Sequence, residues 1–238
     1  MRESASSIST SRPVALALAG TLVLSSILTL VSNPGRAAET ISGRAVVIDG
    51  DTIDIDGRRI RLEGIDAPET AQTCPRQWVG WWSCGSAATK ALARMTDGRR
   101  MDCDNRGHDK YGRILGVCAV DGRDINAEMV RAGYAWAFVK YSTIYVEAEA
   151  EARALKIGIW QGDAEPAWSY REHKWQSAET SAPNGCAIKG NVTEHGHIYH
   201  MPWSPWYGKV KVEAGKGERW FCSEAEAREA GWRPVASY

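Results

Sequence analysis

The sequence has 238 residues, of which 44% are hydrophobic and 24% are charged. This composition is ordinary for a soluble globular protein and excludes a wholly disordered chain. Lys and Arg number 29, as do Asp and Glu, so the formal net charge is zero and any binding of phosphate must be local. The length allows one domain with a substantial core and a smaller second unit.

The N-terminus carries the features of a secretory signal. Arg2 and Arg12 precede an apolar run at 14–31, and small residues follow as far as Ala38. This pattern predicts a signal peptide over residues 1–37 and a secreted or periplasmic protein. The apolar run is also about the minimum length for crossing a bilayer, so an uncleaved membrane anchor is the alternative.

Residues 40–62 alternate apolar and polar side chains as β-strands do. A strand that ends near Ile48 leads into an Asp-Gly-Asp turn, and Asp56-Gly57 is a two-residue hairpin signal between the next two strands. Pro68 excludes the segment that follows from a central strand position.

Helices and further strands are expected as far as residue 160. Residues 71–83 have no clean period and are predicted to be a loop. Hydrophobic spacing and turn signals predict the remaining elements: helices over 83–96, 125–133 and 143–155, strands over 101–104 and 114–120, and an extended segment over 134–141. Together they describe a mainly β domain with helices, an α+β fold, over residues 40–160.

The last third of the chain is predicted to hold a separate module. Residues 161–185 lose the hydrophobic period and are predicted to be a linker. Residues 186–238 form a small α+β module, in which Ser223 and Glu226 fit a helix capping box. Its histidines could bind zinc with a cysteine, but a disulfide with exposed histidines fits better. Its aromatic residues could grip single-stranded nucleic acid or form the core of the module.

Six cysteines lie in the exported part of the chain. An even number in an oxidising compartment suggests disulfides, and nearness in sequence suggests which pairs form. The predicted pairs are Cys74–Cys84, Cys103–Cys118 and Cys186–Cys222.

Carboxylates and arginines gather between residues 48 and 70. An EF-hand loop that begins at Asp49 is excluded, because its sixth and twelfth positions are not Gly and Glu. Asp51 and Asp66 instead offer hard oxygen ligands, which suit calcium or magnesium. Glu69 could orient or deprotonate a water, and Arg61 with Arg113 from a later strand could neutralise a phosphate.

Three motifs follow one another with the spacing of a known family: Ile48-Asp49-Gly50-Asp51-Thr52, Arg61-Leu62-Glu63-Gly64-Ile65-Asp66-Ala67-Pro68-Glu69 and Asp109-Lys110-Tyr111-Gly112-Arg113. They resemble the motifs of the staphylococcal nuclease (thermonuclease) family, and the resemblance covers about residues 40–160. It implies an OB-fold barrel of five strands with three helices, in agreement with the predicted elements. It also implies calcium-dependent hydrolysis of phosphodiester bonds in DNA and RNA.

The resemblance also implies roles for individual residues. These are Ca2+ ligands at Asp51, Asp66 and the backbone carbonyl of Ala67, catalytic groups at Arg61, Glu69 and Arg113, and substrate contacts at Lys110, Tyr111 and Tyr141. The chain departs from the family at Ala67, where the prototype has threonine, and at Val139, which replaces a tyrosine that packs on the nucleotide.

The predicted function is that of an exported, calcium-dependent phosphodiesterase or endonuclease acting on DNA, RNA or both. The alternative is a catalytically weak OB-fold module of the cell envelope that binds nucleic acid or protein. Retention of Arg61, Glu69 and Arg113 favours the enzyme. No stable protein partner is implied, and a membrane is involved only if the N-terminal segment stays uncleaved.

Overall fold

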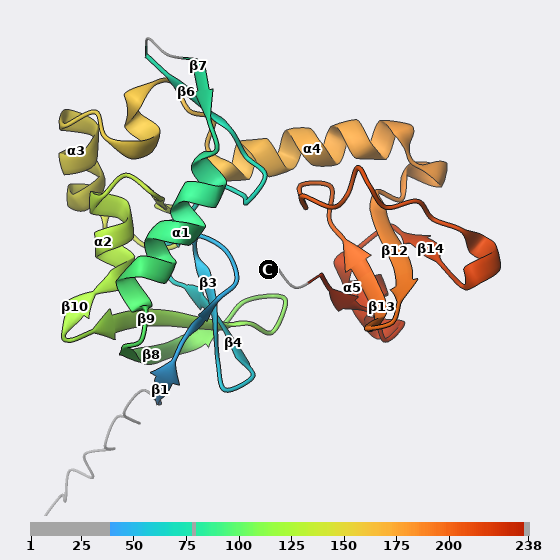
Figure 1. The fold of residues 1–238 in the computed structure, drawn as a ribbon, viewed down its shortest axis with the longest axis horizontal. Coiled ribbons are helices and arrows are strands. Elements are labelled where there is room, and N and C mark those ends of the chain that lie inside the picture. The colour runs from blue at the N-terminus through green and yellow to red at the C-terminus, as the bar shows by residue number, and fades with distance from the viewer. Residues whose placement is uncertain (1–38, 78–79, 236–238) are drawn as a thin grey trace, which may run out of the picture. The chain divides into compact units, whose positions relative to one another are not determined.

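The computed structural model describes residues 39–77 and 80–235 of this α+β protein (Figure 1). The predicted signal at 1–37 lies outside the described residues. No helix in the described part of the chain is long and apolar enough to cross a membrane.

A seven-stranded sheet forms the framework of the first domain. Six strands follow the order β1-β8-β9-β4-β3-β2, and β10 pairs with β9. Their bounds are β1 Thr40–Arg44, β2 Val46–Val47, β3 Thr52–Ile55, β4 Arg58–Leu62, β8 Arg100–His108, β9 Ile114–Val120 and β10 Arg123–Asp124. Strands β4 and β9 pair in parallel and the other pairs are antiparallel. The predicted hairpin at Asp56-Gly57 is confirmed, with both residues at positive φ as a tight hairpin turn requires.

Three helices accompany this sheet: α1 Cys84–Thr96, α2 Ile125–Arg131 and α3 Val146–Ala154. The buried core joins the inner faces of the strands to α1 and α2, with Ile53, Ile60 and Leu62 fully buried. Asn126 at the start of α2 is also fully buried. Its side chain accepts a hydrogen bond from the backbone of Cys118 and donates to two carbonyl oxygens. The helix is therefore fixed to the sheet by polar contacts as well as by packing.

A second buried cluster surrounds the Cys74–Cys84 disulfide. The predicted loop at 71–83 contains a short hairpin, β6 Cys74–Arg76 and β7 Gly80–Trp82. The extended segment expected over 134–141 is reduced to β11 Trp136–Ala137, which pairs with β5 Ile65–Asp66. A 3-10 helix, η1 Gly158–Gln161, completes this region. The other two disulfides join Cys103 to Cys118 and Cys186 to Cys222, so all three predicted pairs form.

The segment predicted to be a linker, 161–185, contains a helix, α4 Ala167–Ser181, and a 3-10 helix, η2 Pro183–Gly185. Only Ala167 and Ala178 are buried along α4. A helix with so little buried surface has no apolar stripe to reveal it.

The C-terminal module contains a four-stranded sheet in the order β14-β12-β13-β15. Its elements are β12 Ile188–Thr193, β13 Gly196–His200, η3 Ala214–Lys216, β14 Arg219–Phe221, α5 Glu224–Glu229 and β15 Arg233–Pro234. Aromatic residues serve as its core, since Tyr199, Phe221 and Trp232 pack together. The predicted cap is confirmed, because the side chain of Ser223 accepts from the backbone of Glu226 at 3.1 Å.

His200 is a buried histidine in this module and is 5% exposed. Its Nε2 lies 2.8 Å from Oδ1 of Asn191, and its Nδ1 is buried without a hydrogen-bond partner among the described residues. Burial, and then the positive charge of Lys189, lowers the pKa of His200 to about 4. Because Cys186 and Cys222 are joined to each other, they do not supply the cysteine of a zinc site.

Candidate active site

The turn at residues 49–52 presents Asp51 to the site. Oδ1 of Asp49 accepts a hydrogen bond from the backbone N–H of Asp51 at 3.0 Å, and the carbonyl of Asp51 accepts from the N–H of Leu62 at 2.8 Å. Residue 50 must be glycine, because the Cβ atom of any other residue would lie 2.6 Å from Cβ of Ala67. The turn is therefore pressed against the segment that carries the next two site residues.

Asp66 and Ala67 lie beside this turn. Asp66 belongs to β5, pairs with Trp136 of β11 and is completely buried. The backbone N–H of Ala67 donates to Oδ2 of Asp51 at 2.9 Å. Strand pairing and this hydrogen bond thus bring together the three residues that the sequence nominated as cation ligands.

Arg61 on β4 joins the two aspartates. Its Nη1 lies 2.6 Å from Oδ1 of Asp51, and its Nη2 lies 2.6 Å from Oδ1 of Asp66. The guanidinium side chain is only 16% exposed. A planar cation that spans two buried carboxylates compensates both charges and fixes their separation.

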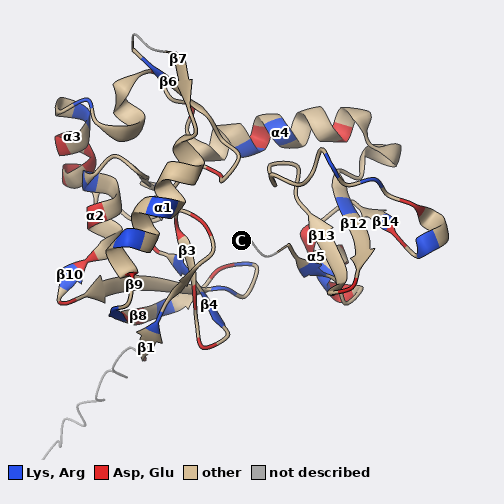
Figure 2. Cartoon of the chain, viewed as in Figure 1, with Lys and Arg blue, Asp and Glu red and all other residues tan. Residues whose placement is uncertain are grey.

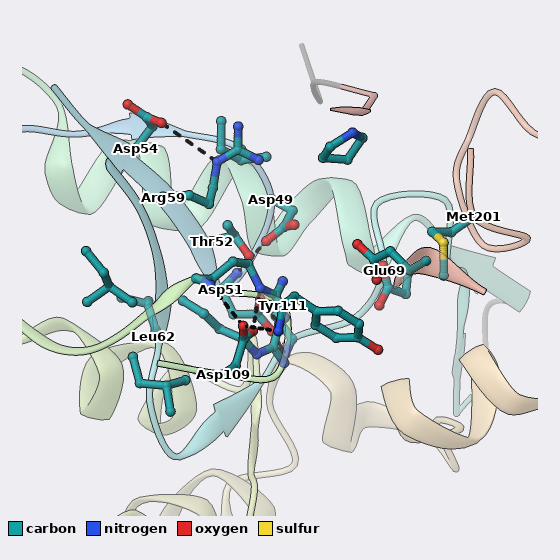
Figure 3. Close-up of a pocket in the computed structure, with 18 of the residues that line it drawn as sticks. Asp49, Asp51, Thr52, Asp54, Arg59, Leu62, Glu69, Asp109, Tyr111 and Met201 are labelled. Atoms are coloured by element: carbon teal, nitrogen blue, oxygen red, sulfur yellow. Dashed lines mark hydrogen bonds and ion pairs between the residues drawn. The ribbon is translucent and has the colours of Figure 1, made fainter. Parts of the chain in front are cut away.

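Glu69 lies in a loop whose backbone is held from two sides. Gln72 accepts a hydrogen bond from the N–H of Glu69 through Oε1 at 3.1 Å, and its own N–H donates to the carbonyl of Glu69 at 2.6 Å. On the other side, Gly85 of α1 is so close that a Cβ atom would lie 1.7 Å from that carbonyl oxygen. The position of Glu69 is therefore set by the fold. Figure 3 shows Asp49, Asp51 and Glu69 around one pocket, which Arg61 also lines.

Arg171 on α4 is a site residue that the sequence did not indicate. Its Nη1 lies 3.1 Å from Oδ1 of Asp66 and 2.8 Å from Oε1 of Glu69, and its Nη2 lies 2.9 Å from Oδ2 of Asp66. The absence of Gly and Pro from 167–182 is a helix signal, but it gives no indication that the helix reaches the site.

Acidic and basic residues are interspersed along the chain (Figure 2). At the site, burial and the nearest charged side chains shift the pKa values of the carboxyl groups. Burial, and then the charge of Asp51, raises the pKa of Asp49 to about 6. Burial also raises the pKa of Glu69 to about 7, although the nearby Arg171 opposes the shift. For Asp51, burial would raise the pKa, but the charge of Arg61, the hydrogen bond from Ala67 and the more distant arginines together outweigh it, and the pKa falls below its usual value. Burial thus favours the protonated forms of Asp49 and Glu69, whereas the neighbouring positive charges favour the ionised form of Asp51.

Arg113 lies at the same pocket and forms an ion pair with Asp109. Its Nε lies 2.6 Å from Oδ2 of Asp109, whose Oδ1 accepts from the backbone N–H groups of Tyr111 and Arg113. Within the described residues, Arg113 forms no ion pair with Asp51, Asp66 or Glu69. It still lies near enough for its charge to lower the pKa of Asp51.

The three residues proposed to contact the substrate lie at the same pocket. The Nζ of Lys110 is 4.8 Å from the centre of the Tyr111 ring, and Figure 3 shows Tyr111 beside Asp109 at the edge of the pocket. Tyr141 is 68% exposed, and the centre of its ring lies 4.9 Å from that of Phe138. All three are therefore available to a ligand outside the buried carboxylates.

The donor set fits a hard divalent cation. Two aspartates and a backbone carbonyl are oxygen ligands of the kind that calcium and magnesium take, with water filling the remaining positions. Across 39–77 and 80–235, no group of three or more His, Cys, Asp or Glu side chains is arranged to hold a metal ion. The proposed donor set contains only two carboxylate side chains, Asp51 and Asp66, because its third ligand is the backbone carbonyl of Ala67. In the structure, the guanidinium groups of Arg61 and Arg171 bind these aspartates.

The sequence matches two family models, one for staphylococcal nuclease homologues over residues 59–162 and one for ArfC over residues 171–234. An uncharacterized endonuclease of Escherichia coli is 40% identical over 157 residues, which are 62% of this chain and 95% of that protein. Micrococcal nuclease of Shigella flexneri is 33% identical over 182 residues, 68% of this chain and 94% of that protein. Succinoglycan biosynthesis protein ExoI of Rhizobium meliloti is 37% identical over 148 residues, 60% of this chain and 76% of that protein.

The nuclease match covers part of the site and begins after Asp51. Arg61, Asp66 and Glu69 lie inside the nuclease match, whereas Arg171 lies outside it and is the first residue of the ArfC match. Relatives of 33% and 40% identity are matched over nearly their whole length. The chain belongs to the staphylococcal nuclease family, and it is a nuclease.

Proposed function

We propose that this protein is an exported, calcium-dependent nuclease that hydrolyses phosphodiester bonds of DNA, RNA or both. The observation that carries the proposal is the fork of Arg61 across Asp51 and Asp66, with Glu69 at the same pocket. Metal-assisted hydrolysis of a phosphodiester uses three groups: a cation site, a positively charged hydrogen-bond donor to the phosphate, and a carboxylate base.

The chemistry assigned to the chain is a water attack on phosphorus. Glu69 accepts the proton of the attacking water as the new P–O bond forms. The P–O bond to the leaving nucleotide breaks, its electron pair stays on the leaving oxygen, and that oxygen takes a proton from solvent. Arg61 donates hydrogen bonds to the phosphoryl oxygens, where negative charge develops.

The carboxylates of Asp51 and Asp66 and the backbone carbonyl of Ala67 would hold the calcium ion. When bound, the ion supplies positive charge at the phosphoryl group. This assignment is supported by the hydrogen bond from the N–H of Ala67 to Oδ2 of Asp51, which keeps the three groups adjacent.

The remaining residues are assigned to the substrate. Arg113 is proposed to leave Asp109 for a phosphate oxygen, and the loop that carries it lines the same pocket as Glu69. Lys110, Tyr111 and Tyr141 would contact the nucleotide. Aromatic side chains can stack on any base, so this set suits substrates without strict sequence preference.

Export is supported by the three disulfides, which are typical of proteins outside the reducing cytosol. It agrees with the signal-like composition of residues 1–37. The expected location is the periplasm or the medium.

Cleavage of labelled single- and double-stranded DNA and RNA tests the proposal. Wild type, Glu69→Gln and the matched control Glu172→Gln, an exposed residue of α4, are assayed with calcium, with magnesium and with a chelator. We expect calcium-dependent cleavage that falls about 100-fold or more in Glu69→Gln and is unchanged in the control. No calcium-dependent cleavage by wild type would favour a binding module, and full activity in Glu69→Gln would remove that residue from its role.

A further inference from the structure

Arg171 donates three hydrogen bonds to two of the site carboxylates, Asp66 and Glu69. Its two terminal nitrogens bind both oxygens of Asp66, at 3.1 and 2.9 Å, and one of them also binds Oε1 of Glu69 at 2.8 Å. The side chain of Asp66 is 0% exposed and that of Arg171 is 22% exposed. A bidentate pair of this kind, formed away from bulk water, is a strong and directional contact.

The start of α4 is anchored so that Arg171 is held at this place. Ala167 is completely buried in the cluster around the Cys74–Cys84 disulfide, and the ring of Trp168 stacks on Phe138 with 5.4 Å between centres. Gln72, which holds the backbone of Glu69, also donates to the carbonyl of Glu165 at 2.7 Å. Arg171 follows one turn after these contacts.

The charges explain why a second guanidinium is needed. Asp49, Asp51, Asp66 and Glu69 lie close together in a poorly hydrated site, and each carboxylate lost from water requires a partner. Arg61 uses its two terminal nitrogens on Asp51 and on one oxygen of Asp66. Among the described residues, the second oxygen of Asp66 has Arg171 as its hydrogen-bond donor.

We propose that Arg171 is a positioning residue of the cation site, which holds Asp66 and Glu69 in the cation-free protein and competes with the divalent cation for Asp66. The inference rests on the proposed function, because it takes Asp66 as a cation ligand. A cation bound by Asp66 meets the positive charge of Arg171 and must displace its hydrogen bonds. Arg171 therefore weakens cation binding and stabilises the protein that lacks the cation.

Two readouts besides activity follow from this competition. Without Arg171, the cation meets one guanidinium at the aspartates, that of Arg61, instead of two, so calcium binds more tightly, on the order of tenfold. The cation-free protein also becomes less stable, because buried Asp66 loses one of its partners. Calcium should then raise the melting temperature of the variant more than that of wild type.

The experiment measures calcium binding by calorimetry and melting temperature with and without calcium, on the full chain. The variant is Arg171→Met, which keeps an unbranched apolar stem. Lys174→Met is the matched control, because it removes one positive charge from the exposed side of the same helix. Arg171→Lys is the second variant, since an ammonium keeps the charge but cannot form the fork, and it carries the test if Arg171→Met fails to fold.

We expect the calcium dissociation constant to fall in Arg171→Met, to fall less in Arg171→Lys and to stay near the wild-type value in Lys174→Met. If wild type binds calcium and Arg171→Met binds it no more tightly than the control, the inference fails and the proposed function stands. Weaker binding in Arg171→Met would also overturn it, because Arg171 would then be preparing Asp66 for the cation. If wild type binds no calcium, the proposed cation dependence fails and the inference falls with it.

Discussion

Gly85 allows the first turn of α1 to lie against the loop that carries Glu69. A Cβ atom at this position would be 1.7 Å from the carbonyl oxygen of Glu69 and 2.9 Å from the carbonyl carbon of Thr70. Real Cβ atoms do not approach other atoms within 3.0 Å, so in Gly85→Ala the helix or the loop must move by more than 1 Å. The obstacle is backbone, which cannot swing aside as a side chain can.

Two opposing terms set the size of the effect. Alanine is favoured over glycine inside a helix by about 1 kcal/mol. Forcing extra atoms into a packed region costs about 1–3 kcal/mol, and contact with backbone belongs at the upper end of that range. We therefore expect Gly85→Ala to lower the free energy of unfolding by about 2 kcal/mol, although the same change in an open helix would raise it. A shift of about 1 Å in the loop would also misplace Glu69 and reduce the cleavage rate by about 100-fold.

Urea denaturation and cleavage of labelled DNA measure the two effects separately. Gly208→Ala is the control, because a Cβ atom there would meet nothing within 4 Å. The control should match wild type in both assays. If Gly85→Ala also matches wild type in stability and rate, the close approach of α1 does not position Glu69, and the argument from packing is wrong.

Three further predictions concern stability. Since the pKa of buried His200 is about 4 against an ordinary 6.5, the unfolded chain takes up a proton first as the pH falls. The stability that His200 contributes is complete above pH 6.5 and falls by about 3 kcal/mol towards pH 4. Because buried Asp49 and Glu69 titrate in the same range with the opposite sign, the contribution is measured as a difference. In urea denaturation, the change from pH 7 to pH 5 should lower the stability of wild type and of exposed His195→Gln by about 2 kcal/mol relative to His200→Gln, and an equal pH response in all three would contradict the assignment. Asn126→Ala, which removes three hydrogen bonds, should cost about 3 kcal/mol in urea denaturation, and a loss below 1 kcal/mol would contradict that role. Replacing Cys186 and Cys222 by serine opens a bridge across 36 residues and should destabilise the module by about 2–4 kcal/mol, visible as a lower melting temperature; an unchanged melting temperature would contradict a stabilising role for this bridge.

Local signals predicted the parts of the fold that depend on neighbouring residues. The Asp56-Gly57 turn and the cap at Ser223 depend on residues close together in the sequence, and each disulfide joins one cysteine to the next along the chain. No local feature of residues 134–141 predicts that only Trp136–Ala137 forms a strand, β11. A two-residue strand exists only because its partner β5 is present, and a partner distant in the chain leaves no period in the sequence.

The site also combines features that local sequence predicts with features that depend on distant parts of the chain, as Arg113 and Arg171 show. Arg113 lies at the pocket, where it pairs with Asp109, and the motif around Asp109 did not predict this pair. Arg171 is separated from Asp66 by 105 residues, and it reaches the site only because α4 starts from a buried alanine and a stacked tryptophan. Charge compensation in a buried site selects whichever cation the fold brings within reach. The nuclease motifs specify the carboxylates, Arg61 and Arg113, whereas Arg171 comes from the helix that leads into the C-terminal module. A chain cut before residue 167 would therefore retain every motif residue and lose the partner of the second oxygen of Asp66.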